Sequence, residues 1–184
     1  RHQIICGVTD KGLIECFGID DDGQSNGFKP KKATDGNFVG VSAGADHTCG
    51  VTDTGLIECF GIDDKGTSFL CHHSQNRCGK PKNATDGKFV GVSAGEDHTC
   101  GVTDNGLIEC FGERMRNSKK PRKATDGEFV GVSAGIYHTC GVTDKGLIEC
   151  FGSDKDGQTN GGHPFHFDYC RRDFGNDGRG TKCE

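Results

Sequence analysis

The sequence has few of the residues that build a large hydrophobic core. It contains no tryptophan, one methionine and two tyrosines, and only 32% of its 184 residues are hydrophobic. Glycine accounts for 31 of the 184 residues, a share well above the roughly 7% of an average protein. A helical bundle needs a continuous apolar face on each helix, so this composition argues against one. We expect a turn-rich fold that draws part of its stability from another source.

Two further absences concern location. No apolar stretch approaches the roughly 18 residues that a membrane-crossing helix needs, so we expect no membrane span. The chain has no signal peptide and opens at Arg1 inside a repeat, which predicts a mature product or a fragment. The net charge of -5 is modest and by itself selects no partner.

Disulfide bonds between the many cysteines could provide the stability that a large hydrophobic core would otherwise give. There are 12 cysteines, an even number, and pairing them requires an oxidising compartment because cytosolic thiols are kept reduced. The sequon Asn83-Ala84-Thr85 fits the same compartment and predicts glycosylation at Asn83. We therefore predict an extracellular, secreted protein.

One segment recurs along most of the chain. The string HTCGVTDTGLIECFG at 47–61 returns with a single changed residue at 98–112 and at 138–152, and a fourth, divergent copy lies near 4–18. The first cysteines of the copies are separated by 43, 51 and 40 residues. Internal periods of this length are typical of propeller blades.

Each copy reads as a β-hairpin. Residues 47–52 and 56–60 have strand composition, and a further strand, FVGVSAG at 38–44, precedes them. The intervening DTG predicts a three-residue loop with Gly55 in the left-handed region. This loop length pairs Val51 with Ile57 and Cys49 with Cys59.

Opposed residues in an antiparallel pair have Cα atoms about 4.5 Å apart, which is close enough for a disulfide. We therefore predict four cross-strand disulfides, each contributing roughly 2 to 3 kcal/mol by loop closure: Cys6–Cys16, Cys49–Cys59, Cys100–Cys110 and Cys140–Cys150. The remaining cysteines are predicted to close two loops, Cys71–Cys78 and Cys170–Cys183. Half-buried Glu58, Glu109 and Glu149 would need hydrogen-bond partners.

The pattern VSAG..HTCGVTD.GLIECFG, followed by DDDGQSNG, resembles the repeats of the regulator of chromosome condensation family. The resemblance extends to about residue 162 and implies a β-propeller of four-stranded blades, commonly seven. Phe60, Phe111 and Phe151 stand where the family has tryptophan. Four units could close a small propeller, form an open arc, assemble with a second chain or be a piece of a longer protein.

These observations predict an all-β fold, a β-propeller-like array of about four blade units with cross-strand disulfides. The repeat array would occupy residues 1–162. Residues 163–184 would form a C-terminal tail closed by a disulfide.

Several patterns are compatible with metal binding, and we expect no metal or other cofactor. His47, His98 and His138 recur at one position and could form a ring of imidazoles, although the family resemblance favours a framework role in which they bond the backbone. CHHSQNRC at 71–78 matches no standard zinc spacing, and a disulfide-closed loop is simpler. The alternating aspartates of 20–26 and 154–160 leave calcium as an alternative.

The connectors between hairpins are basic and suit an anionic polymer. The candidate ligand-binding residues are connector and loop side chains: Lys31, Lys82, Arg122, Asn76, Arg77, Arg114 and Arg116. The alternative is a set of solvated connectors whose charges are offset by nearby aspartates.

No sequence motif indicates an enzyme. We therefore predict a secreted, non-catalytic binding module, lectin-like or protein-binding, that uses variable loops to hold an extracellular glycan or protein. The alternative is a self-associating building block of an extracellular matrix, filament or large complex. We expect no nucleic-acid partner, because these disulfides would not persist in a nucleus.

Overall fold

The regular structure is β-strand throughout the part of the chain that is described. The computed structural model describes residues 4–18, 29–45, 47–61, 82–96, 98–112, 121–153 and 159. No helix in those segments is long and apolar enough to cross a membrane. The strands are β1 (Ile4–Val8), β2 (Ile14–Gly18), β3 (Phe38–Ala43), β4 (His47–Thr52), β5 (Ile57–Gly61), β6 (Phe89–Ala94), β7 (His98–Thr103), β8 (Ile108–Gly112), β9 (Phe129–Ala134), β10 (His138–Thr143) and β11 (Ile148–Gly152).

The strands form four antiparallel sheets, which we number as blades 1 to 4. Blade 1 contains β1 and β2, blade 2 contains β3 to β5, blade 3 contains β6 to β8, and blade 4 contains β9 to β11. One residue of the following connector extends each of the first three blades: Lys31 pairs with Ile14, Lys82 with Ile57 and Arg122 with Ile108. The predicted all-β array of about four blade units is confirmed.

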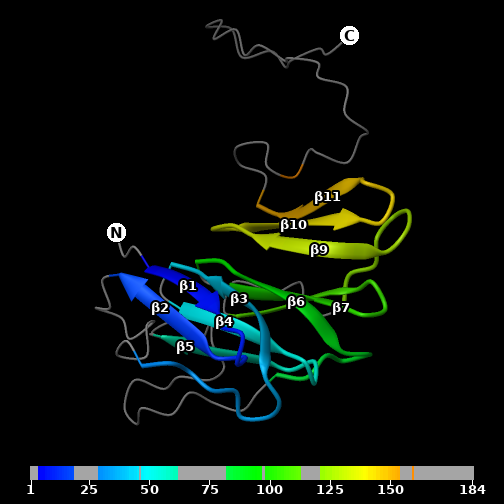
Figure 1. Cartoon of the computed structure of the whole chain (residues 1–184). Coiled ribbons are helices and arrows are strands. Elements are labelled where there is room, and N and C mark those ends of the chain that lie inside the picture. The colour runs from blue at the N-terminus through cyan, green and yellow to red at the C-terminus, as the bar shows by residue number, and fades with distance from the viewer. Residues whose placement is uncertain are drawn as a thin grey trace, which may run out of the picture.

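Each blade packs face to face on the next one, so the sheets form a stack (Figure 1). Strand β1 packs against β3, β4 against β6, and β7 against β9. The first strands β3, β6 and β9 also contact one another in series, which places them on the inner side of the stack. Blades 1 and 4 are therefore its two ends.

The hairpin register predicted from the loop length is confirmed. Val51 pairs with Ile57 and Cys49 with Cys59. Gly55 has a φ of 85° in the turn, the left-handed region that the three-residue loop requires. The Cα atoms of Cys49 and Cys59 are 4.0 Å apart.

The four cross-strand disulfides are present: Cys6–Cys16, Cys49–Cys59, Cys100–Cys110 and Cys140–Cys150. The predicted pairs Cys71–Cys78 and Cys170–Cys183 lie outside the described residues. The same holds for the predicted tail, 163–184.

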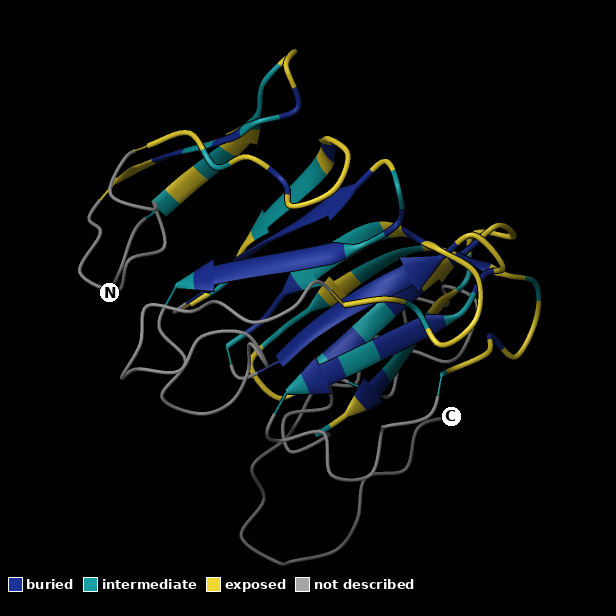
Figure 2. Cartoon of the chain, turned by 90° about the horizontal axis from the view of Figure 1, so that it is seen from below, coloured by how far each residue is buried: buried dark blue, intermediate teal, exposed yellow. Residues whose placement is uncertain are grey.

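The hydrophobic core is divided among the junctions between blades. At the junction of blades 2 and 3, the disulfide Cys49–Cys59, Val51 and Ile57 of blade 2 pack against Phe89 and Phe111 of blade 3. The other two junctions repeat this arrangement with Phe38 and Phe60, and with Phe129 and Phe151. Buried strands therefore occupy the middle of the stack, and the exposed residues gather at turns and connectors (Figure 2). The phenylalanines at the family's tryptophan position are core residues.

The glutamate expected to need a partner has one in each of blades 2 to 4. Glu58 is 6% exposed and accepts hydrogen bonds from the amide of Thr34 at 2.7 Å and from its hydroxyl at 2.9 Å. Thr85 donates in the same way to Glu109, and Thr125 to Glu149. Each carboxylate thereby holds the connector that leads into its own blade. An ionised acceptor makes these bonds stronger than neutral ones.

A glycine in the middle strand of each of blades 2 to 4 provides space for a phenylalanine ring. A Cβ atom added to Gly101 would collide with the ring of Phe89 and with Ile57. We expect Gly101→Ala to lower the free energy of unfolding by about 1–3 kcal/mol, because the packed junction must expand. Urea unfolding of the oxidised protein measures the change.

The matched control is Gly7→Ala, the equivalent position in β1 of blade 1. Among the described residues, no atom lies within 4 Å of a Cβ added there. Its stability should stay close to that of the parent protein. Equal losses in the two variants would contradict the packing argument.

Candidate functional site

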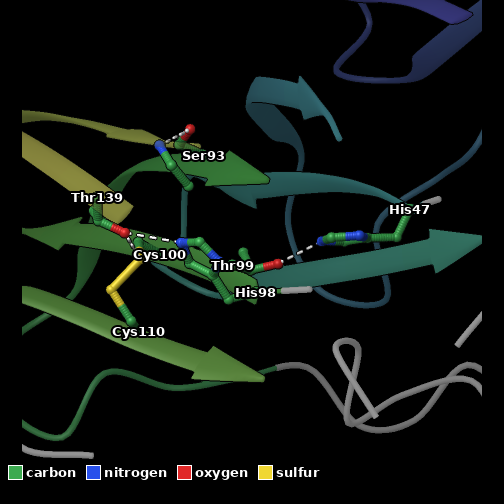
Figure 3. The surroundings of a disulfide bond; sticks show 8 residues. His47, Ser93, His98, Thr99, Cys100, Cys110 and Thr139 are labelled. Carbon is green, nitrogen blue, oxygen red and sulfur yellow. Dashed lines mark hydrogen bonds between the residues drawn. A yellow bond between two sulfur atoms is a disulfide. The ribbon is translucent and has the colours of Figure 1, made fainter. Parts of the chain in front are cut away.

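A histidine side chain bridges the junction of blades 2 and 3 and another bridges the junction of blades 3 and 4; we call these two the inner junctions. Nε2 of His47 in blade 2 shares a hydrogen bond of 2.7 Å with the hydroxyl of Thr99 in blade 3. His98 and Thr139 repeat the bond at 2.8 Å between blades 3 and 4. All four side chains are almost fully buried, and Figure 3 shows both bonds beside a disulfide.

The same threonine hydroxyls also contact the disulfide sulfur of the preceding blade. The Sγ atom of Cys49 lies 3.4 Å from Oγ1 of Thr99, and that of Cys100 lies 3.3 Å from Oγ1 of Thr139. One hydroxyl thus meets both an imidazole and a sulfur of its neighbour. The hydroxyl fixes the height at which one blade sits on the next.

The repeated histidines therefore serve the framework. The Nε2 atoms of His47 and His98 each share a hydrogen bond with a threonine side chain of the next blade, a partner that the sequence analysis did not name. Within the described segments, no group of three or more His, Cys, Asp or Glu side chains converges on a point that could hold a metal ion. The candidate calcium stretch 20–26 lies outside these segments, as does 154–160 apart from Thr159.

Two further hydrogen bonds cross each inner junction, and sequence reasoning missed them. The Ser42 hydroxyl accepts from the amide of Ala94 at 3.0 Å, and Ser93 accepts from Ala134 at 2.9 Å. The amide of Ala45 donates to the carbonyl of Gly95 at 3.1 Å, and that of Glu96 to Gly135 at 3.4 Å. The available signal was the recurrence of a serine in every VSAG string.

The predicted basic residues of the connectors occupy equivalent places. Lys31, Lys82 and Arg122 each form the single-residue bridge on the outer edge of a blade. Lys82 and Arg122 are exposed and Lys31 is half-buried. The next residue along the chain is also an exposed cation in two connectors, Lys32 and Lys123. We call these five side chains the basic edge.

One member of the basic edge is held by an aromatic ring. The guanidinium carbon of Arg122 lies 4.5 Å from the centre of the Phe151 ring in the next blade. A cation over an aromatic face at this distance is attracted to the ring. Arg122 is therefore oriented and still exposed.

In blade 2 the position after the bridging lysine is Asn83, the predicted glycosylation site. Asn83 is exposed, and the hydroxyl of Thr85 in its sequon bonds Glu109. A glycan on Asn83 would stand on the outer edge next to Lys82. The other predicted binding residues, Asn76, Arg77, Arg114 and Arg116, lie outside the described part of the chain.

The loop between the first and second strands of a blade was not singled out from the sequence. In blade 4 it exposes Ile136 by 53% and Tyr137 by 48%. The equivalent loops carry Ala45 in blade 2 and Glu96 in blade 3, so one position has three different chemistries. Framework positions do not vary in this way.

The hairpin turns carry carboxylates that are already engaged. Asp53 accepts from the backbone amide of Asn37 at 2.9 Å, and Asp104 and Asp144 make the same bond with Lys88 and Glu128. The bond from the Asn37 amide holds the pKa of the Asp53 carboxyl below its usual value. A hydrogen bond with Asp126 raises the pKa of Lys145. These groups hold the turns together.

The two threonines at equivalent positions allow the histidine bond to be tested. We expect Thr99→Val to cost about 1–3 kcal/mol of unfolding free energy, because the buried Nε2 of His47 loses this partner. Thr48→Val is the control, since Ile4 stands in the histidine place of blade 1. The Thr48 hydroxyl contacts only the Cys6 sulfur at 3.8 Å among described side chains. Thermal and urea unfolding measure the stability of both variants. Equal losses of stability in Thr99→Val and Thr48→Val would refute the role of the histidine.

Comparison with known families agrees with the repeat pattern. The family model described as "Regulator of chromosome condensation (RCC1) repeat" matches residues 38–67 and 129–158. No curated protein matches the chain by sequence.

Solved structures resemble the fold at low sequence identity. Human WBSCR16 superimposes with a TM-score of 0.64 at 21% identity, covering 81% of this chain and 44% of that one. The ectodomain named CRINKLY WD40, from the Arabidopsis thaliana receptor kinase ACR4, gives 0.62 at 22% identity and covers 84% and 53%. Yeast RCC1 (Prp20), solved with Kap60 bound, gives 0.61 at 17% and covers 82% and 42%.

The chain thus spans about half the length of the structures it resembles. The matched repeats, the propeller-type fold of those neighbours and the blade geometry agree. Two segments of this chain, 38–67 and 129–158, match the repeat model of the regulator of chromosome condensation family, and its fold is similar to that of yeast RCC1 (Prp20).

Proposed function

We propose that the protein is a non-catalytic binding module of the extracellular space whose basic edge holds a sulfated glycan. The observation that carries this proposal is the equivalent placement of Lys31, Lys82 and Arg122 on three successive blades. A repeated cation fits a repeated anion. The function is therefore lectin-like in the sense predicted from the sequence.

The backbone beneath these cations is held in place before any ligand arrives. The amide of Lys31 donates to Ile14 at 2.8 Å, and the amide of Ile14 donates back at 2.9 Å. Lys82 with Ile57, and Arg122 with Ile108, repeat this pair of bonds. A rigid array loses less conformational entropy on binding, and several weak sites on one array combine through avidity.

The disulfides support an extracellular setting. Four cross-strand pairs persist only in an oxidising compartment. One structural neighbour is the ectodomain of a receptor kinase, which is consistent with this fold working outside the cell. Sulfated glycans are common anionic polymers in that setting.

A protein ligand is a second candidate, supported by the loop that contains Ile136 and Tyr137. Both side chains are about half exposed at the tip of this loop. Exposed tyrosine is enriched among the residues that dominate protein interfaces. The yeast neighbour was solved with a protein, Kap60, bound to it. A protein partner at this loop would leave the basic edge free.

Heparin chromatography with a salt gradient tests the glycan proposal. We expect the triple variant Lys31→Gln, Lys82→Gln, Arg122→Gln to bind about tenfold more weakly or worse, since each exposed ionic contact contributes about 0.2–1 kcal/mol. The matched control changes Lys11, Lys88 and Lys145 to Gln and alters the net charge equally. It should elute near the parent protein.

Elution of both triple variants at the same salt concentration would show that only net charge matters. That result, or no retention of the parent protein at low salt, rejects the glycan proposal. A variant with Ile136→Ser and Tyr137→Ser should elute with the parent protein, because its changes lie outside the basic edge. Weaker heparin binding by that variant would instead point to the loop.

A further inference from the structure

The outer face of blade 4 exposes side chains that the inner blades bury. Val51 and Ile57 of blade 2 are 1% and 0% exposed, and Val102 and Ile108 of blade 3 are 2% and 0% exposed. The equivalent pair in blade 4, Val142 and Ile148, is 38% and 40% exposed. These two residues lie opposite each other beside the disulfide Cys140–Cys150. We call this surface the disulfide face of blade 4.

Blade 1 exposes the opposite kind of face at the other end of the stack. The phenylalanine of the third strand is 3% exposed at Phe60, 8% at Phe111 and 8% at Phe151. In blade 1 the equivalent Phe17 is 66% exposed, and its cross-strand neighbour Ile5 is 76% exposed. We call this surface the phenylalanine face of blade 1.

The two end faces are complementary, because every inner junction joins one face of each kind. Cys49, Val51 and Ile57 pack against Phe111, and Cys100, Val102 and Ile108 pack against Phe151. The disulfide face of blade 4 and the phenylalanine face of blade 1 carry the same residue types at the same strand positions. They are the two halves of a junction that the described chain leaves unformed.

We propose that the disulfide face of blade 4 receives the phenylalanine face of blade 1 from a second copy of this chain. Two copies related by a two-fold axis would form both such junctions at once and close into a pair. The chain covers 44%, 53% and 42% of its structural neighbours, so two copies supply about as many residues as one neighbour. A pair of copies therefore has about the length of one of these neighbours.

The junction between copies differs from the inner ones in its polar part. His138 of blade 4 would meet Ile5, which stands where blades 2 to 4 have Thr48, Thr99 and Thr139. The imidazole–hydroxyl bond of the inner junctions has no counterpart there, and the described residues of blade 1 supply one phenylalanine in place of two. Contact between copies is therefore mainly apolar and weaker than an inner junction. The pair assembles reversibly, at a concentration that can be measured.

Sedimentation equilibrium of the oxidised protein over a range of concentrations tests the proposal. The expected result is a reversible rise from the chain mass of 19.6 kDa to twice that value. Phe17→Glu and Ile148→Lys each place a charge in both junctions of the pair. Each should raise the dissociation constant about tenfold or more, because the apolar contact is lost. Val90→Glu is the matched control, since Val90 is 57% exposed and lies on neither end face.

Mixing the two variants identifies the faces that meet. A mixed pair has one junction with both parent faces and one in which the introduced glutamate faces the introduced lysine, so that opposite charges meet. Association should therefore return in the mixture and stay absent in each variant alone. If instead blade 1 packed on blade 1 of the second copy, or blade 4 on blade 4, only one of the two variants would lose association. The other variant would still pair by itself, without mixing.

Three outcomes overturn the proposal: a single-chain mass at every concentration, a pair that both substitutions leave intact, or a ladder of larger assemblies in place of a closed pair. Circular dichroism melting of each variant confirms that it remains folded. This inference does not rest on the proposed glycan function, because neither substitution touches the basic edge. A variant that fails to pair and still binds heparin separates the two.

Discussion

The contact between the disulfide face of one blade and the phenylalanines of the next is the interaction on which the rest of the structure depends. A single hairpin of this composition has too few apolar residues to bury a core by itself. Stacked hairpins share one, because Ile57 and Val51 are buried in a cluster with Phe89, Ala94 and Phe111 of the following blade. Stability is then the sum of similar nearest-neighbour terms, as in other repeat proteins. The disulfides add to each term by restricting the unfolded chain.

Polar groups decide how the blades are aligned. Apolar packing alone would tolerate sliding of one sheet on another. The bonds of His47 to Thr99 and of Ser42 to Ala94 have fixed partners in the next blade, and a buried polar group that misses its partner loses free energy. The carboxylate of Glu58 acts similarly on the connector at Thr34. Hydrophobic contact thus joins the blades, while hydrogen bonds set their register.

This division of labour leaves the surface free for function. The side chains that maintain the junctions repeat from blade to blade, whereas the exposed loop residues Ala45, Glu96 and Ile136 differ. The basic edge is a third class, since it repeats and yet makes no contribution to the core beyond the contact of Arg122 with Phe151. The proposed binding of a repeating anionic ligand rests on this repetition. The end faces add a surface of another kind, with the chemistry of an inner junction.

The sequence by itself determined the local features, because their partners lie close along the chain. Cys49 and Cys59 are joined by one tight turn, so the position of Gly55 was enough to derive the register and all four disulfides. Only the tertiary structure decided what crosses from blade to blade. The threonine that bonds Nε2 of His47 is 52 residues away in the chain, and no local pattern points to it. The exposure of Val142 and Phe17 likewise depends on which blade stands next to each, and nothing in identical repeats distinguishes a covered face from an open one.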